Sequence, residues 1–198
     1  MNKFFTTTAA AIFAGAMLTG CNSTPAKPLT YQELKDSQPP AITTFGEPKV
    51  DTVISKTNNL QSSINQQLGK YAKEIDSKKE YKDLILEFAN AKEEEIPKIV
   101  TEKFNLTAEL VNKVNPMRKI GEIKALQGQV TDIAKSATDL SKNATSSGIG
   151  FGAEATKAAN RAKALNAVKS NLDYSKKELD FLYNRYELLI NVAKNLKK

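Results

Sequence analysis

The single cysteine, Cys21, is the side chain with the most evident chemistry in this 198-residue chain. A thiolate is a strong nucleophile, and a lone thiol has no disulfide partner in the same molecule. Cys21 follows Leu18-Thr19-Gly20 and an apolar, small-residue stretch from Phe4 to Leu18, which comes after one early cation, Lys3. This order is typical of a secretion signal rather than of a folded element. The stretch is shorter than the roughly 20 residues of a membrane-spanning helix, so we expect it to be cleaved.

The run Leu18-Thr19-Gly20-Cys21 resembles the lipobox of bacterial lipoproteins. The resemblance implies that diacylglycerol alkylates the Cys21 thiol, that residues 1–20 are removed, and that the new amino terminus is acylated. Two or more chains give lasting attachment, because each buried methylene contributes about 0.8 kcal/mol. We therefore expect a mature protein held at the membrane through acylated Cys21. Asn22 follows the cysteine. In Gram-negative lipoproteins an Asp at this position tends to hold the protein at the inner membrane, so the resemblance favours the outer membrane, facing the periplasm, with the inner membrane and the cell surface as alternatives.

The composition argues against most catalytic chemistry. The chain has no histidine and no tryptophan, and its one cysteine is assigned to lipid, which excludes most transition-metal sites and His-dependent nucleophiles. The glycines of 148–152 lack the spacing of a phosphate-binding loop. The run Glu93-Glu94-Glu95 has the pattern of an exposed face or loop rather than of a paired acid site. We predict no catalytic residues, no metal, no cofactor and no enzyme activity.

Three regions follow from the composition: a signal peptide over 1–20, a lipidated cysteine with a proline-rich tether over 21–48, and a helical domain over 49–198. Five of the seven prolines lie in the tether. Such a segment is expected to be extended and not packed, with a maximum reach of about 80 Å and a typical span of about 30 Å. The alternative is that its apolar residues dock on the body or on a partner. These residues are Tyr31, Leu34, Ile42 and Phe45.

Beyond Pro48, apolar residues recur at steps of three and four, which predicts amphipathic helices. We expect a first long helix over about 49–76. Ser77 and Glu80 have the form of a capping box and predict that a second helix begins there; a continuous helix through this point is the alternative. The predicted buried positions of this part are Val50, Val53, Ile54, Thr57, Leu60, Ile64, Leu68, Tyr71, Ile75, Tyr81, Leu84, Ile85 and Phe88.

Two short helices are expected in the middle of the chain. Pro97 fits the first turn of one helix, with Phe104 among its inward residues. Thr107 fits the N-cap of the next helix. These helices would connect the first long helix to the last third of the chain.

Two helices with heptad spacing make up the last third. Pro116 begins the first, a glycine-containing segment over 146–152 interrupts the pattern, and the second runs from 153 nearly to the end. They would be about 45 and 65 Å long and must fold back to bury their apolar stripes. The predicted fold is all-α, an elongated antiparallel three- or four-helix bundle with a long coiled-coil-like C-terminal hairpin. Its predicted buried positions are Ile120, Ile123, Leu126, Val130, Ile133, Ala137, Leu140, Ala144, Ala158, Leu165, Val168, Leu172, Leu179, Leu182, Tyr186, Leu189, Ala193 and Leu196.

Positive charge is concentrated in the last predicted helix. Residues 153–198 hold ten cations and five anions, whereas residues 49–115 hold eleven of each. Lys169, Lys176 and Arg185 are candidate contacts for an anionic amphiphile, a phospholipid or lipopolysaccharide, in a groove between helices. The alternative is the solvated face of an amphipathic helix. Nucleic acid is not an expected partner, because no basic patch with interleaved aromatic residues is present.

Two further residues are candidate contacts for a protein partner. Tyr183 lies off the main apolar seam, and aromatic residues are frequent interface anchors. Phe151 lies in the glycine-containing loop between the two long helices. The alternatives are a wide buried face that includes Tyr183 and a cap over the hairpin end made by Phe151.

These features favour a lipid-anchored envelope lipoprotein that acts as a structural or protein-interaction component through helical coiled-coil surfaces, with an envelope protein as its partner. The alternative function is binding or carriage of an anionic amphiphile in a basic inter-helix groove. The heptads are compatible with seams that close within one chain or in a homo-oligomer. The chain is also similar to murein lipoprotein in its lipobox, its long heptads and Lys198, but it differs in the proline-rich tether and in having several helices.

Overall fold

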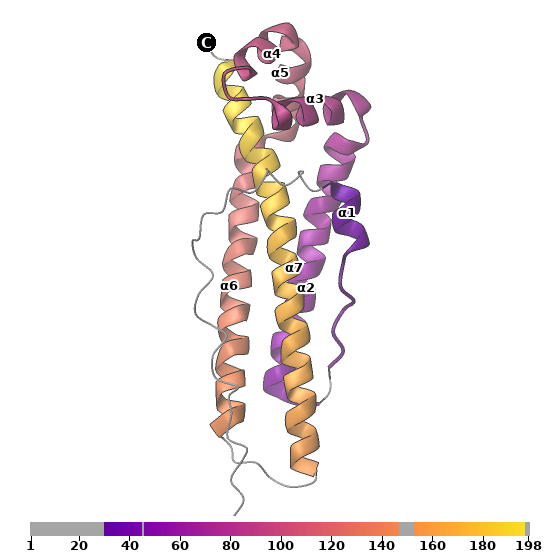
Figure 1. The fold of residues 1–198 in the computed structure, drawn as a ribbon, viewed down its shortest axis with the longest axis vertical. Helices are drawn as coiled ribbons and strands as arrows, with labels where there is room; N and C mark the ends of the chain where they lie inside the picture. Colours follow the sequence, from indigo (N-terminus) through magenta and orange to yellow (C-terminus); the bar gives the residue numbers. More distant parts are fainter. Residues whose placement is uncertain (1–29, 45, 147–152, 197–198) are drawn as a thin grey trace, which may run out of the picture.

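The computed structural model describes residues 30–44, 46–146 and 153–196. Every element of regular structure in these ranges is a helix, so the predicted all-α class is confirmed. Figure 1 shows a long body of parallel and antiparallel helices with a group of short helices at one end, beside the C-terminus. The molecule is therefore wider at this end than at the opposite end of the rod.

The body is a rod of three long helices that pack on one another: α2 (Pro48–Tyr71), α6 (Pro116–Ser146) and α7 (Ala153–Asn195). α6 and α7 form the predicted antiparallel hairpin, and α2 contacts both of them (Figure 1). With 31 and 43 residues, α6 and α7 are about 46 and 65 Å long. Each helix is apolar along one stripe, so the three stripes together close a single core.

The apolar spacing of the sequence predicts this core well. All positions expected to be buried between Val50 and Phe88 are buried. In the hairpin, the predicted positions are buried from Ile123 to Ala137 and from Leu165 to Leu189. The other predicted positions of the hairpin lie before or after these stretches. Those whose side chains are described are partly buried, with one exception.

The exception is Ala158, which is exposed, so its predicted place in the seam is wrong. The register of the helices explains the difference. Arg161 Nη2 lies 2.8 Å from the carboxylate of Glu47, the residue before α2, so α2 starts level with Arg161. The first turns of α7 extend beyond this start and have no third helix to pack on. A heptad pattern shows which face is apolar but not how far the neighbouring helix reaches.

The junction between α2 and α3 (Lys79–Asn90) differs from the predicted capping box. α2 continues into one π-helical turn, η1 (Ala72–Asp76), and the N-cap of α3 is Lys78, which makes no side-chain cap. The Ser77 hydroxyl donates backward to the Lys73 carbonyl, 2.7 Å away. The predicted capping box is therefore wrong, because the Ser77 hydroxyl bonds within the preceding helix.

Three short helices, α3, α4 (Ile96–Glu102) and α5 (Phe104–Val114), form the head of the molecule (Figure 1). α4 carries proline in its first turn, as predicted. Phe104 begins α5 and is 50% exposed, so its predicted burial is wrong. Thr107 lies inside α5, and its hydroxyl donates to the Lys103 carbonyl at 2.8 Å, so its predicted role as an N-cap is also wrong.

The head joins the rod through a left-handed residue. Asn115 ends α5 with φ of +48°, a conformation that asparagine tolerates better than most residues. Pro116 then begins α6, as predicted, because its fixed φ suits the first turn of a helix. The two residues together redirect the chain from the head back along the rod.

One helix was not predicted. α1 (Tyr31–Asp36) lies beside the rod (Figure 1) and begins with a capping box. The Thr30 hydroxyl accepts from the Glu33 N–H at 3.2 Å, and the Glu33 carboxylate accepts from the Thr30 N–H at 2.7 Å. The Thr-x-x-Glu signature is visible in the sequence, but the nearby prolines favoured an extended interpretation.

Candidate functional site

Residues 30–47 form a strap, which we define as α1 plus the extended segment that leads to α2. Leu34 is 2% exposed, and its carbonyl accepts a hydrogen bond from the Tyr174 hydroxyl on α7. Tyr31 and Ile42 are partly buried against the same core. The prediction that this segment is not packed is therefore wrong, and the alternative of docking through these apolar residues is confirmed.

Polar contacts hold the second half of the strap. Asn58 on α2 accepts from the Ile42 N–H at 3.1 Å and donates from Nδ2 to the Ile42 carbonyl at 2.8 Å. Glu47, at the end of the strap, pairs with Arg161 on α7. Phe45, the fourth residue predicted to dock, lies outside the described residues. The strap is thus attached to both α2 and α7.

Beneath the strap, three buried side chains link α2 to α7. We call Gln61, Ser175 and Glu178 the amide cluster. Gln61 Nε2 donates to Glu178 Oε2 at 2.6 Å, and the Ser175 hydroxyl donates to Gln61 Oε1 at 2.8 Å. Glu178 is 1% exposed, and burial raises the pKa of its carboxyl to about 7, although the hydrogen bond from Gln61 opposes the rise. The two hydrogen bonds fix the orientation of the Gln61 amide.

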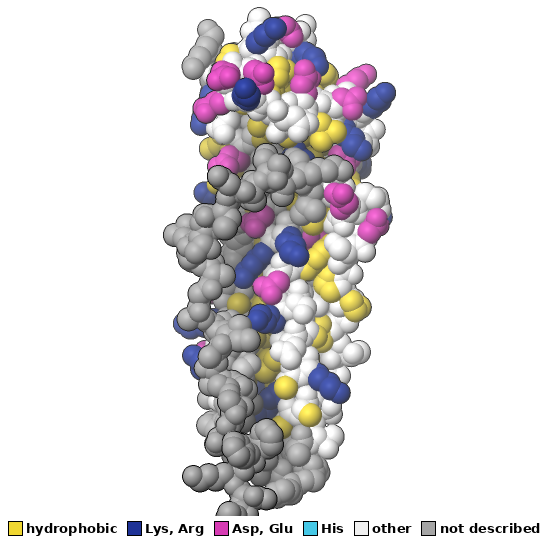
Figure 2. Space-filling model, in the orientation of Figure 1, with side chains coloured by type: hydrophobic (Ala, Val, Ile, Leu, Met, Phe, Trp, Pro, Cys, Tyr) yellow, Lys and Arg dark blue, Asp and Glu magenta, His cyan; other side chains and the backbone are white. Residues whose placement is uncertain are grey.

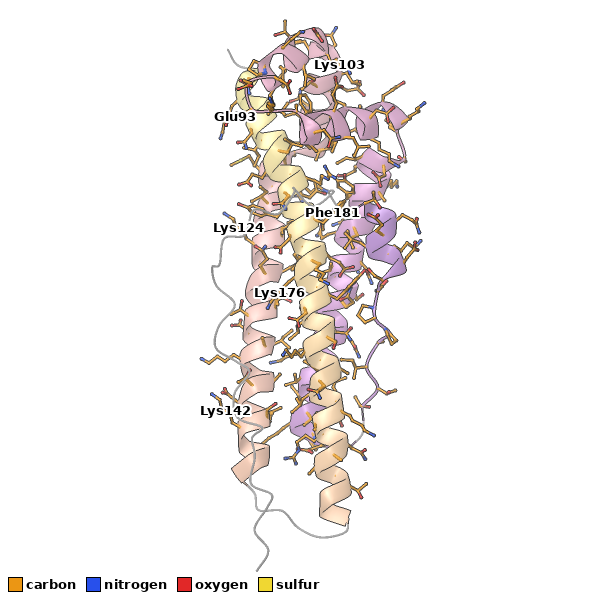
Figure 3. The ribbon with its side chains drawn as sticks, in the orientation of Figure 1. Glu93, Lys103, Lys124, Lys142, Lys176 and Phe181 are labelled. Carbon is orange, nitrogen blue, oxygen red and sulfur yellow. The ribbon has the colours of Figure 1, made fainter. Side chains whose placement is uncertain are left out.

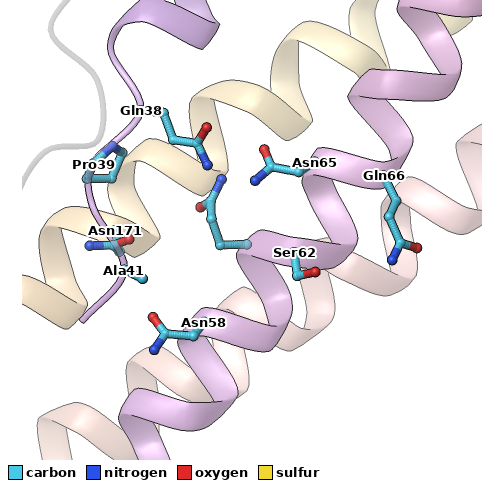
Figure 4. A pocket seen from close by; sticks show the side chains of 9 residues that line it. Gln38, Pro39, Ala41, Asn58, Ser62, Asn65, Gln66 and Asn171 are labelled. Atoms are coloured by element: carbon cyan, nitrogen blue, oxygen red, sulfur yellow. The ribbon is translucent and has the colours of Figure 1, made fainter. Parts of the chain in front are cut away.

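A pocket of about 420 Å³ opens between the strap, α2 and α7 (Figure 4). We call it the amide pocket, because six of its nine lining residues carry side-chain amides. None of the nine is charged or aromatic. The lining residues are Gln38, Pro39, Ala41, Asn58, Gln61, Ser62, Asn65, Gln66 and Asn171.

The amide pocket is not among the predicted sites, although the sequence contains one signal for it. Residues 57–69 contain no charged side chain, in a chain in which 26% of residues are charged. Ser62, Asn65 and Gln66 within this run are exposed. The exposed face of a rod helix normally carries charges. An uncharged polar face therefore marks a surface that presents hydrogen-bonding groups instead.

A second group of buried side chains, three of them with polar atoms, lies nearer the head. We call Tyr71, Phe181, Arg185 and Tyr186 the waist cluster. The Tyr71 ring meets the rings of Phe181 and Tyr186 edge to face, with centroids 5.3 and 6.1 Å apart. Arg185 is 7% exposed, and its guanidinium carbon lies 5.5 Å from the centre of the Phe181 ring. Burial raises the pKa of both tyrosines, which keeps them neutral.

The basic residues predicted to bind an anionic amphiphile do not meet in one place. Lys169 and Arg185 are separated by about 24 Å along α7. Lys176, labelled in Figure 3, lies between them with its ammonium 3.8 Å from Asp173, and Arg185 is buried. None of the three lines the amide pocket or a second pocket of about 310 Å³ between α2 and α6. These three residues therefore do not come together at either pocket, and their contact with an anionic amphiphile stays a prediction.

The remaining predicted contacts are only partly described. Cys21 and Phe151 lie outside the described residues. Tyr183 is partly buried, its hydroxyl donates to the Glu187 carboxylate at 3.2 Å, and the Lys124 ammonium lies 6.0 Å from its ring centre. Tyr183 also packs against the edge of the hydrophobic core, so its ring is neither fully buried nor fully exposed.

Charge differs between the head and the two hairpin helices. Residues 79–115 hold eight acidic and six basic residues, whereas residues 116–198 hold eight acidic and fifteen basic residues. In the view of Figure 2, acidic side chains gather on the head, with basic and apolar side chains between them. The run Glu93-Glu94-Glu95 is exposed before α4, as predicted. The head therefore offers a mixed, mildly acidic surface.

Across the described ranges, no helix combines the length and the apolar character needed to cross a membrane, and no group of three or more His, Cys, Asp or Glu residues could hold a metal ion. Comparison with family models, curated proteins and solved structures finds no match to this chain. The function must therefore be argued from the residues and their arrangement.

Proposed function

We propose that this protein is a lipid-anchored component of the cell envelope, held at the outer membrane facing the periplasm, that binds a protein partner through its helical body. The Leu18-Thr19-Gly20-Cys21 run supports the anchor. The strap is the observation that carries the proposal, because it connects the anchored end of the chain to the rod through specific contacts. The role requires no catalysis.

The strap shortens the connection between the anchor and the body. Thr30 follows Cys21 by nine residues, which reach at most about 30 Å when fully extended. A flexible chain of nine residues has a typical span of about 15 to 18 Å. The reach of about 80 Å expected for a free tether is therefore too long. An anchored body would be held close to the bilayer.

The strap also meets the rod midway along its length. Tyr174, which donates to the Leu34 carbonyl, is 21 residues from either end of α7, or about 32 Å. This distance exceeds the typical span of the connection. An upright rod would therefore stretch the nine residues close to their limit. The geometry favours a rod that lies alongside the bilayer, with the head beyond the anchor point and available to a partner.

The proposal is tested by fractionation of cell envelopes, followed by crosslinking, affinity capture and mass spectrometry. We expect the wild-type protein in the outer-membrane fraction, with a defined set of crosslinked proteins. Cys21→Ser should move the protein to the soluble fraction and lose that set, because the thiol that carries the lipid is gone. Ser23→Ala is the matched control, since it changes a neighbouring residue and leaves the thiol intact.

Two results would contradict the proposal. Retention of the Cys21→Ser protein at the membrane would show that the lipid is not the anchor. An anchored wild-type protein that captures no partner above the level of the variant would argue against a protein-interaction role.

A further inference from the structure

The protein already binds an extended backbone on the face of α2 that lines the amide pocket. Asn58 accepts from the Ile42 N–H at 3.1 Å and donates to the Ile42 carbonyl at 2.8 Å. A backbone residue offers one donor and one acceptor, and a side-chain amide offers the complementary pair. Asn58 therefore shows how an amide on this face holds an extended segment without contacting its side chains.

Further polar groups continue this face towards the head. Ser62, Asn65 and Gln66 follow Asn58 by one and two helical turns and line the same pocket. Gln38 lies opposite on the strap, and in Figure 4 the amide ends of Gln38 and Asn65 point towards each other. Within the described part of the chain, the side chains of these four residues make no hydrogen bond to another protein group. They are available to a ligand.

The floor of the pocket is fixed, in contrast to these available groups. Gln61 is held by Ser175 and Glu178. Asn171 is 4% exposed, and its Nδ2 donates to the Ala167 carbonyl at 3.1 Å. A preorganised floor lowers the entropy cost of binding, because fewer side chains must be ordered when a ligand arrives.

The chemistry of the lining limits the class of ligand. No lining residue is charged, and the nearest charged positions along α2 are Lys56 and Lys70, on either side of the uncharged run. Glu178 bonds to the floor residue Gln61, but it is 1% exposed and does not line the pocket, so a charged group there would lose hydration without contacting an opposite charge. No lining residue is aromatic, so no ring is available for a sugar to stack on. Pro39 and Pro40 have no N–H, so the strap offers only backbone acceptors there.

We infer that the amide pocket binds an extended, uncharged segment of a partner polypeptide through the segment's backbone, as Asn58 binds Ile42. The inference rests on the proposed function and deepens it by naming the surface and the chemistry of partner recognition. Segments of small, non-proline residues suit the site, because short side chains let the ligand backbone approach the amides and each such residue keeps its N–H. The strap has one such small residue, Ala41, at the pocket.

The test uses the chain from residue 21 onward with Cys21→Ser, which retains every described core residue, since these run from Leu34 to Val192. A phage-displayed library of random octapeptides is selected on this protein, and synthetic versions of the enriched peptides are measured by calorimetry. We expect enriched peptides without charged residues and 1:1 binding. The side-chain amide NMR signals of Asn65 and Gln66 should shift when such a peptide is added.

A pair of variants gives the control. Asn65→Ala combined with Gln66→Ala should weaken binding of the selected peptides about tenfold or more, because several hydrogen bonds are lost. Asn59→Ala removes an exposed amide from the same helix outside the amide pocket and should leave the affinity unchanged. Circular dichroism confirms that each variant keeps its helix content.

Three results would overturn the inference. The first is that no peptide is enriched, and the second is that enriched peptides bind the double variant as well as the parent. The third is that the protein binds chitotriose, a sugar used as the competing class of ligand, and no peptide. None of these assays involves a lipid. Their failure would therefore leave the Cys21 anchor intact, whereas failure of the envelope fractionation would leave peptide binding intact.

Discussion

Polar side chains are buried between α7 and α2 at two positions along the rod, the amide cluster and the waist cluster. The hydrogen bonding of their polar atoms differs. In the amide cluster, Gln61 bonds to Ser175 and to Glu178 at 2.8 and 2.6 Å. In the waist cluster, about two turns nearer the head, Arg185 packs on an aromatic ring. The buried hydroxyl of Tyr186 has no hydrogen-bond partner in the described part of the chain. The same helix pair thus contains a hydrogen-bonded polar cluster and a cluster in which the Tyr186 hydroxyl is buried without a partner among the described residues.

The difference separates two reasons for burying polar atoms. A paired cluster compensates desolvation and fixes the orientation of its members. An unpaired hydroxyl on a ring gives no such orientation, and ring packing must offset the cost of its burial. We therefore expect the amide cluster to position the floor of the pocket and the waist cluster to act through packing. Removal of a hydrogen-bonded polar group should therefore cost much more stability in the amide cluster than removal of the Tyr186 hydroxyl costs in the waist cluster.

Gln61→Leu should be the most destabilising of the changes considered. Leucine has a similar volume, but it removes the donor to Glu178 and the acceptor for Ser175, and both remain buried. We expect a loss of about 3 kcal/mol in the free energy of unfolding. Urea denaturation followed by circular dichroism measures this loss.

Gln67→Leu is the matched control on the same helix. Its Oε1 is buried and has no hydrogen-bond partner in the described part of the chain. The same substitution there removes an unpaired atom, so we expect a change below about 0.5 kcal/mol. Equal losses in the two variants would show that the hydrogen bonds of Gln61 in the amide cluster add nothing to the free energy of unfolding.

Glu178→Gln isolates the charge in the amide cluster. Burial raises the pKa of this carboxyl from 4.5 to about 7, so the native state keeps a proton that the unfolded state releases between these values. Wild-type stability should therefore fall as the pH rises through this window. We expect the variant to match wild type near pH 5 and to be more stable by about 2 kcal/mol at pH 8.

Urea denaturation of both proteins at the two pH values measures this effect. The comparison between wild type and variant removes the contributions of other titrating groups, which are common to both. A difference that does not change with pH would exclude the buried acid as its source.

The sequence could predict the rod because a helical period alone decides which face of a long helix is buried. It could not predict the head to the same degree, because short helices depend on local hydrogen bonds. Ser77 and Thr107 both looked like caps, and both donate to a carbonyl four residues earlier. The residue pattern of an N-cap does not distinguish the two bonds.

The amide pocket was beyond sequence reasoning for a different reason. It combines segments that are far apart in the chain, as in the bond between Gln61 and Glu178 across 117 positions. The uncharged run over 57–69 is visible in the sequence, but its neighbours on the strap and α7 are not. The lipid motif at Cys21 is local and easily read, and it stays a prediction because it lies outside the described residues.

Lys119→Met tests a partly buried ion pair beside the waist cluster. The Lys119 ammonium lies 3.0 Å from Glu74, and the two side chains are 11% and 28% exposed. Methionine keeps the apolar stem and removes the charge, so Glu74 loses its cation. We expect a loss of about 1 kcal/mol, less than for Gln61→Leu, because Glu74 retains some access to water. Urea denaturation measures it.

Arg118→Met is the control for this ion pair. Arg118 lies 3.1 Å from Glu122, but its side chain is 77% exposed. Solvent screens such a pair, so the free energy of unfolding should change by less than about 0.5 kcal/mol. A similar change in both variants would mean that partial burial adds nothing to the pair beside the waist cluster.

Tyr186→Phe should have the smallest effect, because it removes a buried hydroxyl that has no partner and keeps the ring against Tyr71. We expect stability within about 0.5 kcal/mol of wild type or slightly above it. Tyr174→Phe, which removes the donor to the Leu34 carbonyl, should cost about 1 kcal/mol in the same urea assay. Equal losses would mean that the Tyr186 hydroxyl has a partner in solution, such as a buried water, and the waist cluster would then be a paired cluster like the first.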